Sequence, residues 1–292
     1  MRVAITGGTG YLGPIVIEEL LREGHEVTAL EHRQRAPDAS NARLRRVKGD
    51  VRDVASLREA FRGCDAVVHL VAILRENKKR GVTFERMHVE ATRNVLQAAR
   101  EEGVRRYLHM SANGVESGLD TPYFRTKKAA EELVRASGLD WTIFRASYIA
   151  GPGGFDAQFA DIVDKAPVLP SFAGGKFEIQ PIARRNVAQA FARALTTPEA
   201  VGKTYVLAGP ERMTWNSYLR RLSRVRRRKR PLVYAPGPLM IGLARVAGPL
   251  FPADADALRM LMLGNVGDNS ESVKDLRLEL EPWEDAVAEL RR

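Results

Sequence analysis

The sequence contains only one cysteine, Cys64, among its 292 residues. A single cysteine excludes an internal disulfide, and we expect Cys64 to pack as a small apolar side chain in a cytoplasmic protein. The five histidines lack the spacing of metal ligands, so the sequence predicts no metal site. No signal peptide is recognised, because Met1 and Arg2 lead directly into the first apolar run.

Long apolar runs are also lacking. The most apolar segment, residues 238–251, is interrupted by prolines and by Arg245 and is too short to cross a bilayer. Its first interpretation is a roof over a substrate cleft; a dimer contact and a helix on a membrane interface are the alternatives.

Acidic residues are fewer than basic residues, and the formal net charge is +10 at pH 7. This balance favours an acidic partner such as a nucleotide, an anionic membrane or an acidic protein. Nucleic acid is not predicted, because no binding motif is recognised. Eight basic residues between Arg220 and Arg230 are interpreted first as a solvated helix end and second as a peripheral surface for anionic lipid.

At its start the sequence has a glycine-rich turn between a predicted buried strand, residues 3–5, and an amphipathic helix, residues 15–21. The glycines fit both G-x-G-x-x-G and G-x-x-G-x-x-G. Glycines let the backbone approach a ligand, and the helix start offers N–H groups to a pyrophosphate. The residues assigned to this site are Gly7, Gly10, Tyr11, Leu12 and Gly13.

An acidic residue, Glu31, ends the second predicted strand. A carboxylate there accepts hydrogen bonds from the adenosine ribose and repels a 2′-phosphate, which favours NAD. Arg33 and Arg35 follow and could hold that phosphate, so NADP stays open.

Strand and helix patterns alternate through the first half of the chain, which predicts an α/β fold of the Rossmann type, a doubly wound parallel sheet. After Gly154 the regular alternation of strand and helix patterns ends. We expect a dinucleotide-binding domain over residues 1–155 and a C-terminal part over 156–292. That part adds to the core a late strand at Lys203 to Leu207 and a helix that Asn186 could cap and that runs to Thr196. It also forms a small, mainly helical lobe that covers the substrate.

Three polar side chains could carry out chemistry. Tyr123 and Lys127 are four residues apart at the start of a predicted helix and therefore share a face. Ser111 follows the fifth strand. A lysine charge would lower the pKa of Tyr123, which could then exchange the alcohol proton while hydride moves to or from nicotinamide. Ser111 would hold the substrate oxygen, and Lys127 would also bind the cofactor ribose.

A family resemblance is carried by motifs that occur in this order: the glycine turn, Gly49-Asp50-Val51, His69-Leu70-Val71-Ala72, Ser111, Tyr123-Phe124-Arg125-Thr126-Lys127 and Tyr148-Ile149-Ala150-Gly151-Pro152-Gly153. The chain resembles the short-chain dehydrogenase/reductase superfamily, in its extended and atypical, epimerase/dehydratase-like branches. The stretches 88–94, 138–142 and 263–269 are similar to proteins that resemble the dehydrogenase-like accessory subunit of respiratory complex I.

The resemblance implies further cofactor contacts: Asp50 and Val51 at the adenine, Leu70, Val71 and Ala72 along the adenosine and ribose, and Ala146 and Ile149 beside the nicotinamide. Two positions depart from the family pattern, because His88 stands where asparagine is common and Ala146 where proline is common.

Two functions follow as expectations. The first is an NAD(P)-dependent oxidoreductase or nucleotide-sugar-epimerase-like enzyme that acts on a small alcohol or carbonyl. The second is a non-catalytic dinucleotide-binding accessory or sensor protein of a membrane redox complex. A homodimer through the helices predicted at residues 84–100 and 122–137 is a further expectation.

Overall fold

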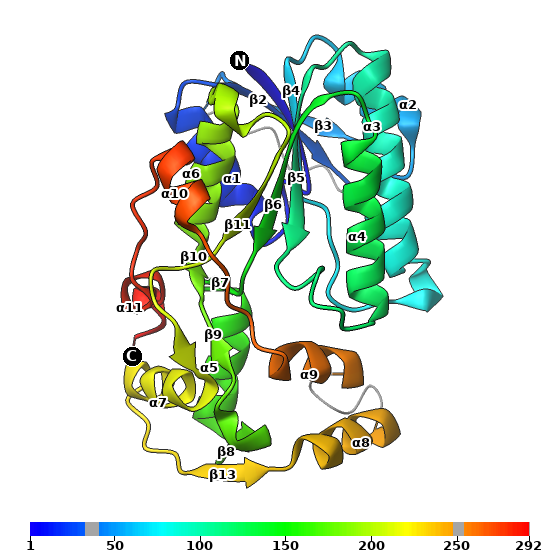
Figure 1. The fold of residues 1–292 in the computed structure, drawn as a ribbon. Helices are drawn as coiled ribbons and strands as arrows, with labels where there is room; N and C mark the ends of the chain where they lie inside the picture. Colours follow the sequence, from blue (N-terminus) through cyan, green and yellow to red (C-terminus); the bar gives the residue numbers. More distant parts are fainter. Residues whose placement is uncertain (33–40, 248–253, 292) are drawn as a thin grey trace. The chain divides into compact units, whose positions relative to one another are not determined.

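The computed structural model describes residues 1–32, 41–247 and 254–291. Its contacts divide the chain into two units. The first unit combines Met1–Ala146, Arg185–Val206 and Ser270–Glu279, and the second combines Ser147–Arg184, Leu207–Asn269 and Leu280–Arg292 (Figure 1).

The first unit is built on a seven-stranded sheet with the order β11-β6-β5-β4-β1-β2-β3. The neighbouring strands from β6 to β3 all pair in parallel. The chain starts in the middle of the sheet and moves first to one edge and then to the other, so the predicted doubly wound fold is confirmed. The strands are β1 Arg2–Thr6, β2 Glu26–Glu31, β3 Leu44–Lys48, β4 Ala66–His69, β5 Arg106–Ala112, β6 Asp140–Ala146 and β11 Lys203–Leu207.

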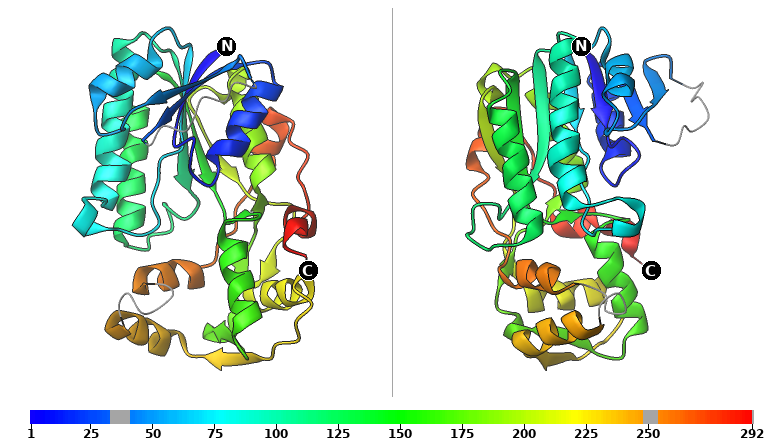
Figure 2. Two further views of the ribbon diagram at one scale, coloured as in Figure 1. Left: turned by 180° about the vertical axis from the view of Figure 1, so that it is seen from behind. Right: turned by 90° about the vertical axis from the view of Figure 1, so that its right-hand side faces the viewer.

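Helices cover both faces of this sheet (Figures 1 and 2). Helices α2, α3 and α4 lie on one face and α1, α6 and α10 on the other. Their bounds are α1 Gly13–Arg22, α2 Val54–Phe61, α3 Ala91–Glu101, α4 Pro122–Arg135, α6 Arg184–Ala194 and α10 Ser270–Leu276. A π-helical turn, η2 Glu85–Glu90, leads into α3, and two short 3-10 turns, η1 Lys78–Arg80 and η4 Pro198–Ala200, complete this part.

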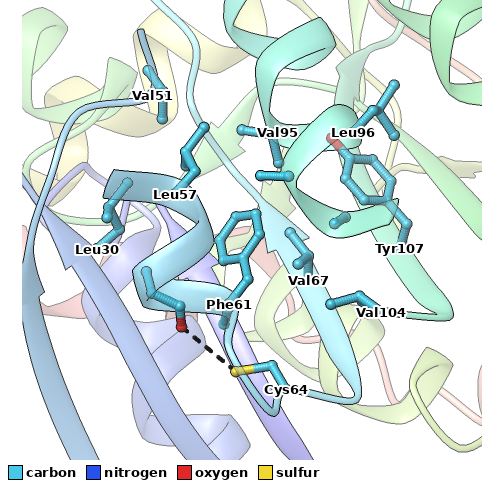
Figure 3. Close-up of a cluster of buried hydrophobic side chains, with 14 of the residues drawn as sticks. Leu30, Val51, Leu57, Phe61, Cys64, Val67, Val95, Leu96, Val104 and Tyr107 are labelled. Carbon is cyan, nitrogen blue, oxygen red and sulfur yellow. Dashed lines mark hydrogen bonds between the residues drawn. The ribbon is translucent and has the colours of Figure 1, made fainter. Parts of the chain in front are cut away.

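The core between the sheet and α2 and α3 is apolar (Figure 3). Leu57 and Phe61 of α2 meet Val95 of α3 and Val67 of β4, all without exposed surface. Cys64 is buried in the same cluster, with its Sγ 3.7 Å from the carbonyl oxygen of Ala60. The prediction that the single cysteine packs as an apolar residue is therefore confirmed.

Side-chain caps explain where two helices begin. The Asp53 carboxylate accepts a hydrogen bond from the Ala55 N–H at 3.0 Å at the start of α2. Thr121 caps α4 by accepting from the Phe124 N–H at 3.2 Å, and Pro122 takes the first helical position, where no N–H is needed.

The predicted cap at Asn186 is wrong. Helix α6 starts two residues earlier, at Arg184, so Asn186 lies inside it. Asn186 is buried, and its amide donates to the carbonyl oxygen of Glu279 at 2.7 Å. Its hydrogen bond therefore fastens a distant part of the chain to the helix instead of ending the helix.

The second unit combines small two-stranded sheets with helices. Phe155, Phe159, Trp215, Tyr218 and Trp283 form its aromatic centre. The strand pairs are β7 Ile149–Ala150 with β10 Ile182–Ala183, β8 Leu169–Phe172 with β13 Leu232–Ala235, and β9 Glu178–Ile179 with β12 Met213–Thr214. The helices are α5 Phe155–Lys165, α7 Trp215–Val225, α8 Gly237–Ala247, α9 Ala255–Met262 and α11 Trp283–Ala286, with 3-10 turns η3 Ala173–Gly175 and η6 Ala288–Leu290.

A buried carboxylate lies at the aromatic centre of the second unit. Asp156 accepts hydrogen bonds from the Tyr218 hydroxyl at 2.9 Å, the Trp283 Nε1–H at 3.1 Å and the Gly151 N–H at 3.0 Å. Burial raises the pKa of Asp156, and these donors oppose the increase. The carboxylate thus fastens α5, α7 and α11 to one another.

Candidate functional site

The glycine turn connects β1 to α1 and leaves no room for side chains. Gly7 has a φ of +80°, and its carbonyl oxygen accepts from the Gly10 N–H at 2.9 Å. A Cβ on Gly13 would lie 2.2 Å from the Gly8 carbonyl oxygen. Tyr11 is half-buried and Leu12 is buried. The backbone at the start of α1 therefore meets the turn directly, as a pyrophosphate cradle requires.

A second loop packs against this turn. A Cβ on Gly7 would lie 3.1 Å from the backbone of both Leu70 and Val71, which follow β4. Leu70 and Val71 are half-buried, and Ala72 is exposed. Because β1 and β4 are parallel neighbours, their carboxyl ends bring the predicted phosphate and ribose contacts to one edge of the sheet.

The predicted adenosine contacts lie at the ends of β2 and β3. The Glu31 carboxylate is buried and pairs with Arg46 of β3. Asp50 pairs with Arg52 at 2.6 Å, and this hydrogen bond holds the pKa of the Asp50 carboxyl below its ordinary value. Val51 is buried in the core. The predicted phosphate ligand Arg33, together with Arg35, lies outside the described residues.

Ser111, near the end of β5, donates its hydroxyl hydrogen bond to Glu131 Oε1 at 2.6 Å. Glu131 also pairs with Arg145 at 2.6 Å and with Arg135 at 2.7 Å. Burial alone would raise the pKa of Glu131, but the hydrogen bonds from Arg145 and Ser111 outweigh it and lower that pKa. The Ser111 side chain is thus part of a network of hydrogen bonds and ion pairs centred on the buried Glu131 of α4.

Lys127 is buried, and its Nζ donates to the carbonyl oxygen of Met110 at 2.5 Å. Burial lowers the pKa of Lys127 to about 8, and the charge of Glu131 opposes this change. The ammonium is therefore held against β5 at the end of the sheet where the glycine turn lies.

Tyr123 lies one turn before Lys127 on α4 and remains half-buried. Its ring meets the rings of His88 and Phe84 edge-on, with centroids 5.4 Å and 5.7 Å away. Burial raises the pKa of the Tyr123 phenol to about 12. The predicted lowering of this pKa is wrong for the protein without its cofactor, because desolvation dominates and the lysine ammonium is directed to Met110.

His88 connects the loop after β4 to the start of α4. Its Nε2 accepts from the Ile73 N–H at 3.1 Å, so the hydrogen of the neutral ring is on Nδ1, which donates to Thr126 Oγ1 at 3.0 Å. Burial and the charge of Lys127 lower the pKa of His88 to about 3. The π-helical turn places this ring beside Tyr123. In the sequence, its only signal was a histidine in place of the usual asparagine.

The remaining predicted residues divide between the units. Ala146 is buried at the end of β6 in the first unit, and Ile149 belongs to β7 of the second unit and is not part of this group. His69 and His109 are core residues of adjacent strands. Within residues 1–32, 41–247 and 254–291, no group of histidine, cysteine and acidic side chains is arranged to hold a metal.

The sequence of this chain is similar to those of known proteins. The sequence model of a family described as NAD(P)H-binding matches residues 7–198. Sterol demethylase protein B of Methylococcus capsulatus is 31% identical over 95% of this chain and 93% of its own length. The mitochondrial NADH dehydrogenase (ubiquinone) 1 alpha subcomplex subunit 9 of Rattus norvegicus is 31% identical over 71% of this chain and 56% of its own length. The resemblance to such subunits is thus confirmed.

Solved structures agree on the fold. The dTDP-glucose 4,6-dehydratase DesIV of Streptomyces venezuelae, solved with NAD bound, superposes with a TM-score of 0.79 at 22% identity, covering 99% of this chain and 95% of its own. MoeE5, solved with UDP-glucuronic acid and NAD, gives a TM-score of 0.78 at 18% identity over 99% of this chain and 98% of its own. The epimerase/dehydratase-like fold predicted from the motifs is therefore confirmed.

Proposed function

Because this chain belongs to the NAD(P)H-binding family, we propose that it is an oxidoreductase that reduces a carbonyl group on a small molecule. The observation that carries the proposal is the position of Tyr123 and Lys127. Both lie on the first two turns of α4, and Lys127 Nζ bonds to Met110 near the end of β5. Strands β5, β4 and β1 are successive parallel neighbours, so this pair shares a sheet edge with the glycine turn.

The residues of this edge fit a nicotinamide dinucleotide. The turn at Gly7 and Gly13 has no room for a Cβ, so only backbone lies there, and the adjacent helix start suits a pyrophosphate. We assign the phosphates to this turn, the riboses to Leu70, Val71 and Lys127, and the adenosine to the ends of β2 and β3. When bound, the dinucleotide supplies the hydride.

The protonation state of Tyr123 in the free protein suits the proton donor of a carbonyl reduction. With its pKa near 12, Tyr123 keeps its proton at neutral pH and can donate it to a carbonyl oxygen that receives a hydride on carbon. The neighbouring Lys127 ammonium would stabilise the resulting phenolate. Ser111 could hold the substrate oxygen only by exchanging its bond to Glu131, so the proposal does not depend on Ser111.

NAD is the proposed dinucleotide, with NADP as the alternative. The buried negative charge of Glu31, at the end of β2, opposes a 2′-phosphate, although Arg46 already neutralises part of that charge. We expect NADH to bind more tightly than NADPH in a fluorescence titration. Equal affinities would remove Glu31 from the proposal without affecting the Tyr123 assignment.

A second function is favoured by a specific observation. The Ser111 hydroxyl is bonded to Glu131, and a relative of this chain is named as a subunit of NADH dehydrogenase. A dinucleotide-binding protein that assembles with a redox complex would need no free serine. This alternative predicts NADH binding without turnover.

The experiment that separates the two functions is turnover with NADH and a panel of carbonyl compounds. The panel includes sterol ketones, because a relative is named sterol demethylase protein B. We expect turnover in the parent protein and a decrease of roughly 10³-fold in Tyr123→Phe, with NADH affinity unchanged. NADH binding without turnover on any compound would favour the accessory function.

A further inference from the structure

Helix α8 is apolar on both of its faces. Met240, Ile241 and Ala244 pack into the core of the second unit. Leu239 and Leu243 are 56% and 45% exposed. Val246 follows three residues after Leu243 and is 90% exposed, so the helical repeat places these three side chains along one stripe. An aliphatic stripe of this kind normally marks a surface that meets another apolar phase.

Strand β13, which precedes α8, also has exposed apolar side chains. Val233 and Tyr234 are 47% and 66% exposed. In Figures 1 and 2, β13 and α8 follow one another along the same border of the second unit. An exposed tyrosine beside aliphatic side chains is typical of a surface that reaches a membrane interface, where one end of the ring is apolar and the other wet.

Basic side chains lie immediately before β13 and form a hollow of about 420 Å³. Its lining residues are Arg220, Ser223, Arg224, Arg228, Lys229, Arg230 and Pro231. The hollow therefore presents several guanidinium groups to the solvent from one short segment of the chain.

Some of the cations here serve the fold. Arg226 pairs with the half-buried Asp164 at 2.5 Å, and Arg230 donates to the carbonyl oxygens of Val163 and Asp164 at 3.0 Å each. Arg228 lies 3.6 Å from the same carboxylate. These bonds fix the segment between α7 and β13 against α5.

Other cations of this segment have no acidic partner within the described residues. In the part of the chain that the structure describes, no carboxylate pairs with Arg220, Arg224, Arg227 or Lys229, and all four are exposed. Arg245 adds another exposed positive charge on α8. The aliphatic stripe thus lies in a unit whose adjacent segment carries unneutralised positive charge.

We propose that this basic–apolar face, made of the basic hollow, Val233, Tyr234 and the α8 stripe, binds the surface of an anionic lipid bilayer. Leu239, Leu243 and Val246 enter the headgroup boundary, and the unpaired arginines contact lipid phosphates. The contact is a surface contact, since no helix in the described ranges is long and apolar enough to cross a membrane.

Charge complementarity selects this occupant. Two copies of the chain that met through this face would oppose the same cations across a two-fold axis, which is unfavourable. A nucleic acid would match the arginines but would leave the aliphatic stripe in water. An anionic bilayer offers both phosphates and an apolar layer, so it is the partner that matches both halves of the face.

The test is co-flotation of the full chain with vesicles of phosphatidylcholine alone and of equimolar phosphatidylcholine and phosphatidylglycerol. We expect flotation only with the anionic vesicles. The bound fraction should decrease sharply between low salt and about 1 M salt, where the Debye length is ~3 Å. Flotation with neither vesicle, or equally with both, would overturn the proposal.

Two sets of variants separate the halves of the face. Replacing Arg220, Arg224, Arg227 and Lys229 together by glutamine should reduce partitioning on the order of 10²-fold or more. The matched control removes the same number of exposed cations from the first unit, at Arg62, Lys79, Arg93 and Arg105. An equal loss in both variants would mean that only net charge matters and would overturn the site.

The second set concerns the stripe. Leu243→Gln should reduce partitioning about tenfold, whereas Leu74→Gln, at a leucine that is 74% exposed in the first unit, should leave it unchanged. An unchanged melting temperature and an unchanged stabilisation by NADH verify the fold of every variant. A dimer in light scattering that dissociates in Leu243→Gln, without vesicle binding, would overturn the proposal in favour of self-association.

Discussion

The first unit and the second unit handle charge in opposite ways. At the sheet edge of the first unit, Lys127 and Glu131 are buried, and each charged group is bonded to a neighbour. In the basic–apolar face of the second unit, Arg224 and Lys229 are exposed, and no carboxylate of the described chain neutralises them. We propose that charge in the first region tunes protonation and that charge in the second region binds an external partner.

This difference supports our proposal that chemistry takes place in the first region. Burial moves the pKa of Lys127 to about 8, that of Tyr123 to about 12 and that of His88 to about 3, because the surrounding protein replaces water. Exposed arginines attract an anionic partner at long range and can contact its phosphate groups directly. Substitutions in the two regions should therefore affect different measurements.

The largest effect on cofactor affinity is expected for the glycine turn. In Gly13→Ala the new Cβ would lie 2.2 Å from a backbone oxygen, so the turn must shift and NADH affinity should decrease by roughly 10²-fold. Gly242→Ala, in α8, meets nothing within 4 Å and should stabilise the fold by about 0.5–1 kcal/mol without changing affinity. Fluorescence titration measures the NADH affinity of each variant, and urea unfolding measures its stability. Equal NADH affinities in the two variants would contradict the assignment of the turn.

The next effect is the pH dependence of stability. The pKa of Lys127 is lowered in the folded protein from 10.5 to about 8, so the unfolded chain binds more protons between these values and stability increases with pH across that window. The full increase is about 3 kcal/mol. We expect Lys127→Met to lose this increase in urea unfolding.

The matched control for this prediction is Lys229→Met, at an exposed lysine of the basic–apolar face. It should keep the dependence of the parent protein. If Lys127→Met kept the same slope between pH 8 and 10, Lys127 would not be the group that burial destabilises.

A smaller effect is expected for His88, which positions Tyr123 through Thr126 and the loop at Ile73. His88→Ala should lower kcat about tenfold while NADH affinity stays constant, and His88→Asn should recover part of the rate, since an amide can accept and donate in the same way. Because the pKa of His88 is near 3, the parent's rate should show no step between pH 5 and 8 from this ring. A step that disappears in His88→Asn would show that His88 transfers protons itself.

The smallest effect on stability is expected in the basic–apolar face. Arg224→Gln removes an exposed charge with no acidic partner, so the free energy of unfolding should change by less than about 0.5 kcal/mol. Turnover should stay within twofold of the parent. A larger destabilisation would show that this arginine supports the fold instead of an external partner.

The sequence predicts the local features of the first unit well. The strand at Leu44–Lys48, the Asp53 cap and the turn before α1 follow from short patterns of apolar residues, caps and glycines. These features depend on residues within one or two turns of each other. The alternation of strands and helices then leaves few topologies other than the parallel sheet.

Contacts between distant residues were not predictable in the same way. The bond from Ser111 to Glu131 spans twenty positions, and the pair of Glu31 with Arg46 joins neighbouring strands. Neither contact is visible in a local sequence pattern, and each one occupies the side chain of a residue that was predicted for the site. The cap predicted at Asn186 failed for the same reason, because its partner, Glu279, lies far along the chain.

The central claim is that Tyr123 completes a hydride-transfer site at the sheet edge that holds the dinucleotide. It is tested most directly by single-turnover reduction of a carbonyl compound with NADH deuterated at the transferred position, followed by mass spectrometry of the alcohol. We predict deuterium on the carbinol carbon of the product from the parent protein and loss of that product in Tyr123→Phe, which still binds NADH. The same yield of labelled alcohol from Tyr123→Phe would contradict the account.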